Sequence, residues 1–67
     1  MKTIQINDSQ QTVSDVETLA HILDRLHIEN KGIAIASGER IIPKKTWNEY
    51  LPQDGEVLTI IKATCGG

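Results

Sequence analysis

The stretch that decides the fold is the last of the chain, "EVLTIIKATCGG", residues 56–67. Its first part, 56–63, is dense in aliphatic and β-branched residues, which favour strands. That density predicts a central strand covered on both faces, since strands buried on both sides read as nearly continuous apolar runs. Beyond it, two terminal glycines follow the single cysteine. We therefore expect a folded domain over 1–63 and a flexible tail over 64–67.

Four further strands are expected upstream of this stretch. In "KTIQIN", Ile4 and Ile6 alternate with polar side chains, as in a strand with one buried face. A short return strand, "QTV" at 11–13, follows the turn "NDSQ". "IAIAS" at 33–37 and "RIIP" at 40–43 flank the turn "SGE", which predicts a hairpin.

One amphipathic helix is predicted between the second and third strands. Its apolar residues recur at helical spacing and form one stripe: Val16, Leu19, Ala20, Leu23 and Leu26. Two starts are open, because Ser14 with Glu17 makes an S-x-x-E capping box, while Thr18 can cap a shorter helix. The local pattern favours Ser14. The helix is expected to end in "ENKG", where Asn30 or Gly32 can adopt the left-handed conformation.

The predicted order of elements, ββαβββ, is that of an α+β protein with a mixed sheet and one main helix. It fits the β-grasp, or ubiquitin-like, architecture, in which the first and last strands lie side by side in the centre. We expect the strand around Ile4 to run parallel to the strand around Ile60 and to pair with it. A short helical turn at Trp47, Tyr50 and Leu51 is expected to close a crossing loop, with the Trp47 ring in the core.

Size and charge narrow the range of functions. The 67 residues form one domain with a thin core, and little material remains for the walls of an enclosed active site. A carrier or binding module is therefore favoured over an enzyme. Seven Lys and Arg against nine Asp and Glu are interspersed and form no basic stripe for nucleic acid. No apolar run approaches the length of a membrane span, so a soluble, cytoplasmic protein is expected.

Few side chains are suited to metal binding or nucleophilic catalysis. His21 and His27 lie about 240° apart around a helix and cannot converge on one metal ion. The expected positions are the surface for His21 and the helix end, where a cation is favourable, for His27. Cys65 stands alone and closes no intramolecular disulfide. The sequence predicts no catalytic and no metal-binding residue.

The charged residues are expected to be solvated. Five carboxylates are spread over different elements, without the apolar cradle that general acid catalysis needs: Glu17, Asp24, Glu49, Asp54 and Glu56. Arg40 and Lys62, together with neighbouring aliphatic side chains, are predicted to form a docking surface on the exposed sheet near the tail.

The terminal glycines are the expected working end of the molecule. Without Cβ atoms, Gly66 and Gly67 can thread a channel too narrow for other residues, with Thr64 and Cys65 following. Four extended residues reach roughly 13 Å, enough to place a terminal carboxylate in the active site of another protein. A carboxylate is a poor electrophile, so its use requires activation as an acyl-phosphate or acyl-adenylate by a partner that binds ATP and Mg²⁺.

The segments "TLAHILDRL" and "GIAIASGERIIPKKTWNEYLPQDGEVLTIIKATCGG" resemble the ThiS family, the sulfur carriers of thiamin biosynthesis. The combination of "IAIA", "IIP", "TW", "QDG" and a terminal "GG" carries the resemblance, which covers essentially the whole chain. It implies that a ThiF-like adenylating enzyme activates Gly67 and that sulfur from a cysteine desulfurase converts it to a thiocarboxylate. A ThiG-like thiazole synthase then takes the sulfur. The resemblance implies no cofactor on the chain itself, because the activating partner uses the ATP and Mg²⁺.

The chain departs from the family pattern at three places. "SG" stands where Asn-Gly is usual in the hairpin, "DGE" replaces Gly-Asp, and Cys65 precedes the glycines. The resemblance also favours a helix beginning after Thr18. Three other functions stay open: a MoaD-like sulfur carrier for molybdopterin synthesis, a ubiquitin-like modifier conjugated to lysines, and a redox module that uses Cys65. The first is disfavoured because "IIKATCGG" lacks the proline-containing approach to the glycines that is usual there.

Overall fold

A computed structural model of the chain describes residues 1–62. The predicted tail, 64–67, lies outside the described residues, as does the last residue of the predicted domain. The elements in chain order are β1 (Lys2–Ile6), β2 (Ser9–Val13), α1 (Leu19–Arg25), β3 (Ile33–Ser37), β4 (Arg40–Ile42), the short 3₁₀ helix η1 (Lys44–Thr46) and β5 (Val57–Lys62). This order confirms the predicted ββαβββ arrangement.

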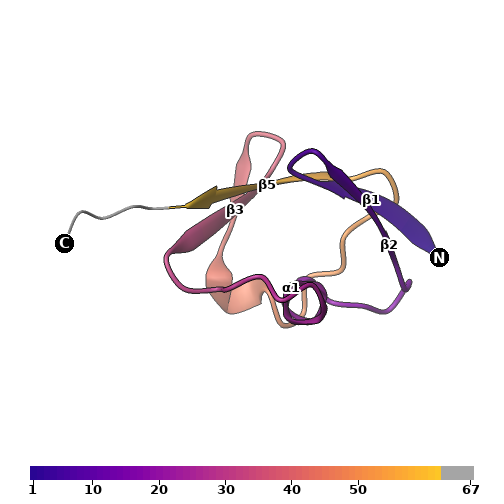
Figure 1. Ribbon diagram of the computed structural model, residues 1–67, viewed down its shortest axis with the longest axis horizontal. Coiled ribbons are helices and arrows are strands. Elements are labelled where there is room, and N and C mark those ends of the chain that lie inside the picture. The colour runs from indigo at the N-terminus through magenta and orange to yellow at the C-terminus, as the bar shows by residue number, and fades with distance from the viewer. Residues whose placement is uncertain (63–67) are drawn as a thin grey trace.

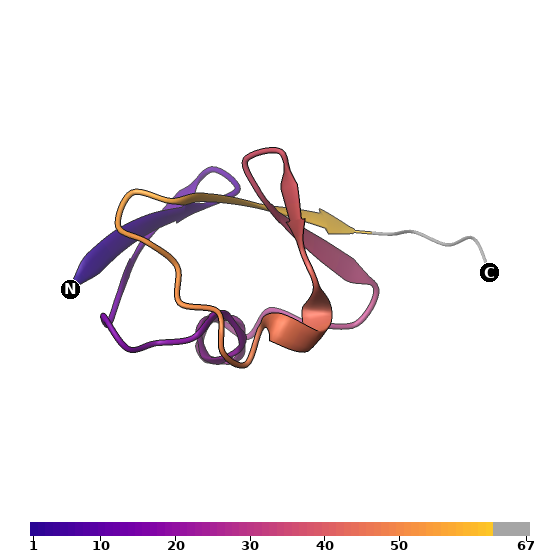
Figure 2. The ribbon, with the colours of Figure 1, turned by 180° about the vertical axis from the view of Figure 1, so that it is seen from behind.

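The five strands form one mixed sheet in the order β2-β1-β5-β3-β4. β1 and β5 run parallel, with Gln5 opposite Val57 and Ile6 opposite Leu58. The other three pairings are antiparallel. The predicted parallel pairing of the first and last strands is therefore confirmed. Figures 1 and 2 show α1 below the sheet, so the molecule has two layers, as a β-grasp fold requires.

The core fills the space between α1 and one face of the sheet. Its buried members are Ile4, Ile6, Val13, Leu19, Ile22, Leu23, Ile35, Ile42, Trp47 and Leu58. Trp47 is only 3% exposed, and its Nε1–H donates to the carbonyl of Ile42 at 3.0 Å. The core position predicted for Trp47 is thus confirmed. The helical turn beside it, η1, begins earlier than predicted, at Lys44.

The helix begins at Leu19, with Thr18 as its N-cap, and not after Ser14. The Thr18 hydroxyl accepts the N–H of His21 at 3.3 Å. The Glu17 carboxylate does accept the N–H of Ser14, at 3.2 Å, as a capping box requires. The residues between them nevertheless form a turn, and Val16, expected on the apolar stripe, is 80% exposed. The start favoured by the local pattern is wrong because a capping contact also stabilises an isolated turn.

The helix also ends earlier than predicted. His27 takes the left-handed conformation, with a φ of 58°. Its N–H donates to the carbonyl of Asp24 at 3.1 Å, and the N–H of Ile28 donates to Leu23 at 2.9 Å. These two bonds make a Schellman motif, in which the residue after the turn contacts the helix. Ile28 packs against the core, which explains why the chain turns at His27 although a glycine follows later.

β5 is covered on one face only. Leu58 is buried and Ile60 partly buried beneath the sheet, whereas Val57 is 48% and Ile61 47% exposed on the other face. The prediction that both faces are covered is wrong, because residues 1–62 supply one helix and no second layer above the sheet. The aliphatic residues of β5 therefore serve two different surfaces.

Asn7 joins the β1–β2 turn to β5. Its N–H donates to the carbonyl of Leu58 at 2.9 Å, and its side-chain Oδ1 accepts the N–H of Ile60 at 2.9 Å. Asn7 has a φ of 53°, a left-handed conformation that asparagine tolerates better than most residues. The side chain thus continues the β1–β5 ladder past the point where β1 itself turns away.

Candidate functional site

The base of the predicted tail is firmly held. β5 ends at Lys62, which pairs with Ile33 of β3 on one side, while Asn7 binds Ile60 on the other. In Figure 1 the arrow of β5 points out of the body of the sheet at this end. The predicted sulfur-carrying residue, Gly67, and the three residues expected to thread into a partner, Thr64, Cys65 and Gly66, lie outside the described residues.

Arg40 and Lys62, the predicted docking pair, are both exposed but stand far apart. Arg40 lies opposite Ser37 and Lys62 lies within the same sheet opposite Ile33. Those partners are four residues apart along β3, about 13 Å at the rise of a strand. Opposed residues of antiparallel strands share a face, so both cations project to the side of the sheet that α1 covers.

The exposed aliphatic residues lie on the opposite face of the sheet. We call this surface the open-face patch and define it by its large exposed members, Ile41, Val57 and Ile61. Ala36 lies opposite Ile41, and Ala34 opposite Ile61, so small side chains separate the large ones. The structure therefore does not bring the two cations and the aliphatic residues into one surface. The open-face patch reaches the base of the tail through Ile61, and Lys62 lies beside it on the other face of the sheet.

Glu17 is the centre of a polar cluster that the sequence did not predict. It is 7% exposed, and the expectation that it is solvated is wrong. Its carboxylate accepts from Arg25 Nε at 2.7 Å and from His21 Nδ1 at 2.8 Å. The hydrogen bond from Arg25 lowers the pKa of Glu17, against the opposing effect of burial. The spacing of Glu17 and His21, four residues apart, was the available signal.

We expect Glu17→Gln to lower the free energy of unfolding by about 1–3 kcal/mol at neutral pH, because the Arg25 guanidinium then faces a neutral amide in place of a carboxylate. A carboxyl whose pKa is lower in the folded state stabilises the fold above its ordinary pKa, here 4.5. That contribution is lost as the pH falls through the folded-state value. Urea unfolding should therefore show a gap between wild type and variant that shrinks in acid. Asp24→Asn, at an exposed position in α1, is the control, and a gap unchanged by pH contradicts the ion pair.

Glu56 is also only partly exposed, contrary to the expectation of full solvation. It accepts from Tyr50 Oη at 2.6 Å, Ser37 Oγ at 2.7 Å and the N–H of Gln53 at 2.7 Å. Burial acts to raise the pKa of Glu56, but these hydrogen bonds outweigh it and the pKa is lowered. Burial, and then the bond to Glu56, raise the pKa of Tyr50. The carboxylate anchors the loop before β5 through these three hydrogen bonds.

The remaining expected surface carboxylates, Asp24, Glu49 and Asp54, are exposed. Asp54 also accepts the N–H of Thr3 at 2.9 Å, which ties the loop before β5 to β1. Over residues 1–62, no three His, Cys, Asp or Glu side chains gather where they could hold a metal ion.

Comparison with known proteins identifies the family. A model of the ThiS family matches residues 2–67, nearly the whole chain and both terminal glycines. The chain belongs to the ThiS family. The sulfur carrier protein ThiS of Escherichia coli K12 is 27% identical over 64 residues, which cover 96% of this chain and 97% of that protein. The crystal structure of the thiamine biosynthesis protein ThiS from Geobacter metallireducens superposes with a TM-score of 0.75 at 15% identity, covering 97% and 99% of the two chains.

The ThiS match confirms the resemblance and the fold drawn from the sequence. The structure in turn confirms the helix start after Thr18 that the family pattern favoured. In this ThiS family member, the part that the structure describes contains no helix long and apolar enough to cross a membrane. Three features of the structure lie at the base of the tail: the end of β5, the contact of Asn7 with Ile60, and the open-face patch.

Proposed function

We propose that this chain carries sulfur for thiamin biosynthesis on the carboxylate of Gly67 and has no catalytic role of its own. The observation that supports this most is the ThiS family match, which runs through residue 67 and so includes both terminal glycines. The E. coli relative bears the name of a sulfur carrier protein. The fold agrees with such a role, because it holds the strand that leads to the tail from both sides.

The proposed cycle begins with activation of the terminal carboxylate. A ThiF-like enzyme binds ATP and Mg²⁺, and the Gly67 carboxylate attacks the α-phosphate, releasing pyrophosphate and forming an acyl-adenylate. Sulfur from a cysteine desulfurase persulfide displaces AMP, and a thiol reductant supplies two electrons to release the thiocarboxylate. A ThiG-like thiazole synthase then takes the sulfur. The chain needs no cofactor, and the need for ATP and reducing thiols favours the cytoplasm.

The length of the tail limits how far the Gly67 carboxylate can lie from the end of β5. Five residues, 63–67, follow the last described residue and reach at most roughly 17 Å when extended. A partner active site must therefore lie within that distance of Lys62. This limit favours docking on the open-face patch, since Ile61 is adjacent to the base of the tail.

We expect Ile61→Asp to weaken binding to the adenylating enzyme by about tenfold or more. A buried interface residue near the centre of contact commonly contributes more than about 1 kcal/mol, and a carboxylate there is also desolvated. Titration calorimetry with the enzyme measures the effect. Val16→Asp is the matched control, because Val16 is 80% exposed and lies before α1, away from the open face. Equal losses in the two variants contradict the assignment of the face.

The function is tested by intact-protein mass spectrometry. The chain is incubated with the adenylating enzyme, ATP, Mg²⁺ and the sulfur donor, and fragmentation locates any change. Replacement of one oxygen by one sulfur at Gly67 supports the carrier. A gain in protein mass that a thiol reductant removes supports the alternative of a redox module that uses Cys65. Isopeptide adducts on lysines support the alternative of a ubiquitin-like modifier. Consumption of the thiocarboxylate by molybdopterin synthase, and not by thiazole synthase, supports the MoaD-like alternative.

A further inference from the structure

β5 extends past its neighbour β1 and leaves part of one edge open. β1 pairs with β5 only through Gln5 opposite Val57 and Ile6 opposite Leu58. Beyond these pairs, the side-chain Oδ1 of Asn7 accepts the N–H of Ile60. Successive N–H groups of a strand point to alternate sides, so the N–H of Lys62 points to the same side as that of Ile60. Within residues 1–62, no strand pairs with this edge beyond Leu58.

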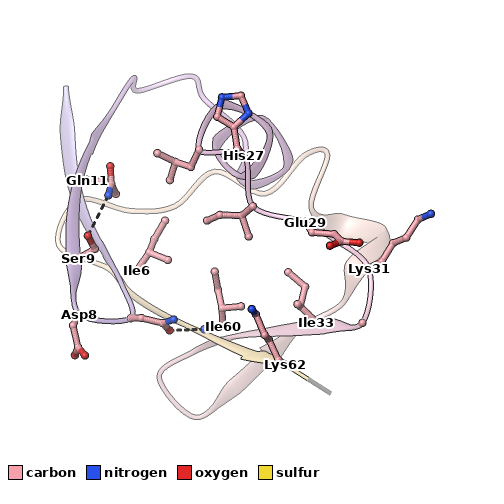
Figure 3. A pocket seen from close by; sticks show the side chains of 14 residues that line it. Ile6, Asp8, Ser9, Gln11, His27, Glu29, Lys31, Ile33, Ile60 and Lys62 are labelled. Atoms are coloured by element: carbon pink, nitrogen blue, oxygen red, sulfur yellow. Dashed lines mark hydrogen bonds between the residues drawn. The ribbon is translucent and has the colours of Figure 1, made fainter. Parts of the chain in front are cut away.

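A cleft of about 990 Å³ lies beneath this open edge, between β5 and the loop that follows α1. Figure 3 shows Ile6, Ile33 and Ile60 directed into it. Leu26 and Ile28 also line it, and these residues and their neighbours Ile33 and Ile60 are only partly buried. The hydrophobic core is thus uncovered at the end of the fold nearest the tail.

The rim of the cleft carries charge of both signs. Lys62 at the end of β5 and Glu29 and Lys31 in the loop after α1 line one side of the cleft, and Asp8 lines it at the β1–β2 turn. Within residues 1–62, neither lysine forms an ion pair. With two lysines and one glutamate, Glu29, this side of the cleft has a net positive charge, which favours a carboxylate from a partner.

We propose that an extended segment of the adenylating enzyme adds to β5 at this open edge and places an aliphatic side chain in the cleft, with a carboxylate between Lys31 and Lys62. Such a segment continues the line of β1, whose inward residues Ile4 and Ile6 are both buried, so its next inward side chain enters the cleft. Main-chain hydrogen bonds supply affinity in this kind of binding, and the pocket supplies specificity. The inference rests on the proposed function, because it names how that partner holds the base of the tail.

Amide hydrogen exchange of the full-length, ¹⁵N-labelled chain tests the strand addition. In a complex with the unlabelled adenylating enzyme, exchange of the Lys62 N–H should slow by about tenfold or more, as expected when a group gains a lasting hydrogen bond. The Ile60 N–H, already bound by Asn7, serves as the internal reference. A Lys62 N–H that exchanges at the same rate in the free and bound chain overturns the inference.

Charge reversal tests the cleft. Lys31→Glu should weaken binding to the enzyme by about tenfold or more, since like charges then face each other. Lys45→Glu makes the same change at an exposed lysine within η1, outside the cleft, and should alter affinity by less than about twofold. Arg25 is unsuitable as a control because it pairs with Glu17. If the two lysine variants weaken binding equally, the proposal that the partner segment binds in the cleft is wrong. Mass spectrometry of the same mixtures reports separately whether Gly67 gains sulfur. A failure of the proposed docking at β5 can therefore be distinguished from a failure of the proposed sulfur-carrier function.

Discussion

Deletion of Gly67, or addition of one residue after it, is expected to abolish thiocarboxylate formation, whereas Cys65→Ala is expected to leave it unchanged. A one-residue change moves the terminal carboxylate by about 3.3 Å along an extended chain, and a misplacement of about 1 Å can already cost roughly 100-fold in rate. Sulfur enters at the acyl carbon of the last residue, so the Cys65 thiol takes no part. Intact-protein mass spectrometry of the three variants, beside the wild type, measures the outcome.

The controls separate loss of chemistry from loss of folding. The three changes come after β5 (Val57–Lys62) in the sequence, so we expect the unfolding midpoint in urea to be the same for all three variants. A chain without Gly67 that still gains sulfur, or a Cys65→Ala protein that gains none, contradicts the proposal that the terminal carboxylate is the carrier.

Trp47→Ala is expected to destabilise the fold by about 3–5 kcal/mol, the usual cost of removing a large buried aromatic side chain. Domains of this kind have a total stability of only about 5–15 kcal/mol, so much of the variant should be unfolded in mild urea. Trp47 also connects two elements, because its carbonyl accepts the N–H of Ala20 in the first turn of α1 at 2.9 Å. Circular dichroism during urea unfolding measures the change, since the variant lacks the fluorescent side chain.

Trp47→Phe is the matched variant. It keeps an aromatic ring but removes the N–H that binds the carbonyl of Ile42, and leaving that group unsatisfied costs about 1–3 kcal/mol. The alanine variant should be the less stable of the two. If the phenylalanine variant is as unstable as the alanine variant, the hydrogen bond matters more than the packing, and the core role assigned to the ring is wrong.

The arrangement of strands could be predicted because side-chain alternation is local information. The alternation of Ile4 and Ile6 fixes which face of β1 is buried, and the length of the aliphatic run in β5 indicates a central position. What covers the far face of a strand depends on other elements, which explains why Val57 and Ile61 were wrongly expected to be buried. The helix start depended in the same way on distant contacts, since the local pattern at Ser14 describes a stable turn as well as a helix.

Less of the candidate site could be predicted. The terminal glycines are visible from their position alone, and their role stays a prediction. The period of two along β5 could have shown that Lys62 shares a face with Ile60 and not with Ile61, which separates the lysine from the open-face patch. The spacing of Glu17 and His21 indicated a polar contact but not the burial of Glu17, whose main partner, Arg25, lies eight residues further along the chain at the end of α1.

The order of strands in the sheet has a consequence for the newly made chain. β1 pairs with β2 and β3 with β4, and β5 is the strand that joins these two hairpins. The Asn7 contact with Ile60 spans 53 residues, so it forms only when nearly the whole chain has been synthesised. Contacts between such distant residues form late in folding. A chain that stops short of β5 has two separate hairpins and no joined sheet, so an unfinished molecule has neither the complete open-face patch nor the cleft.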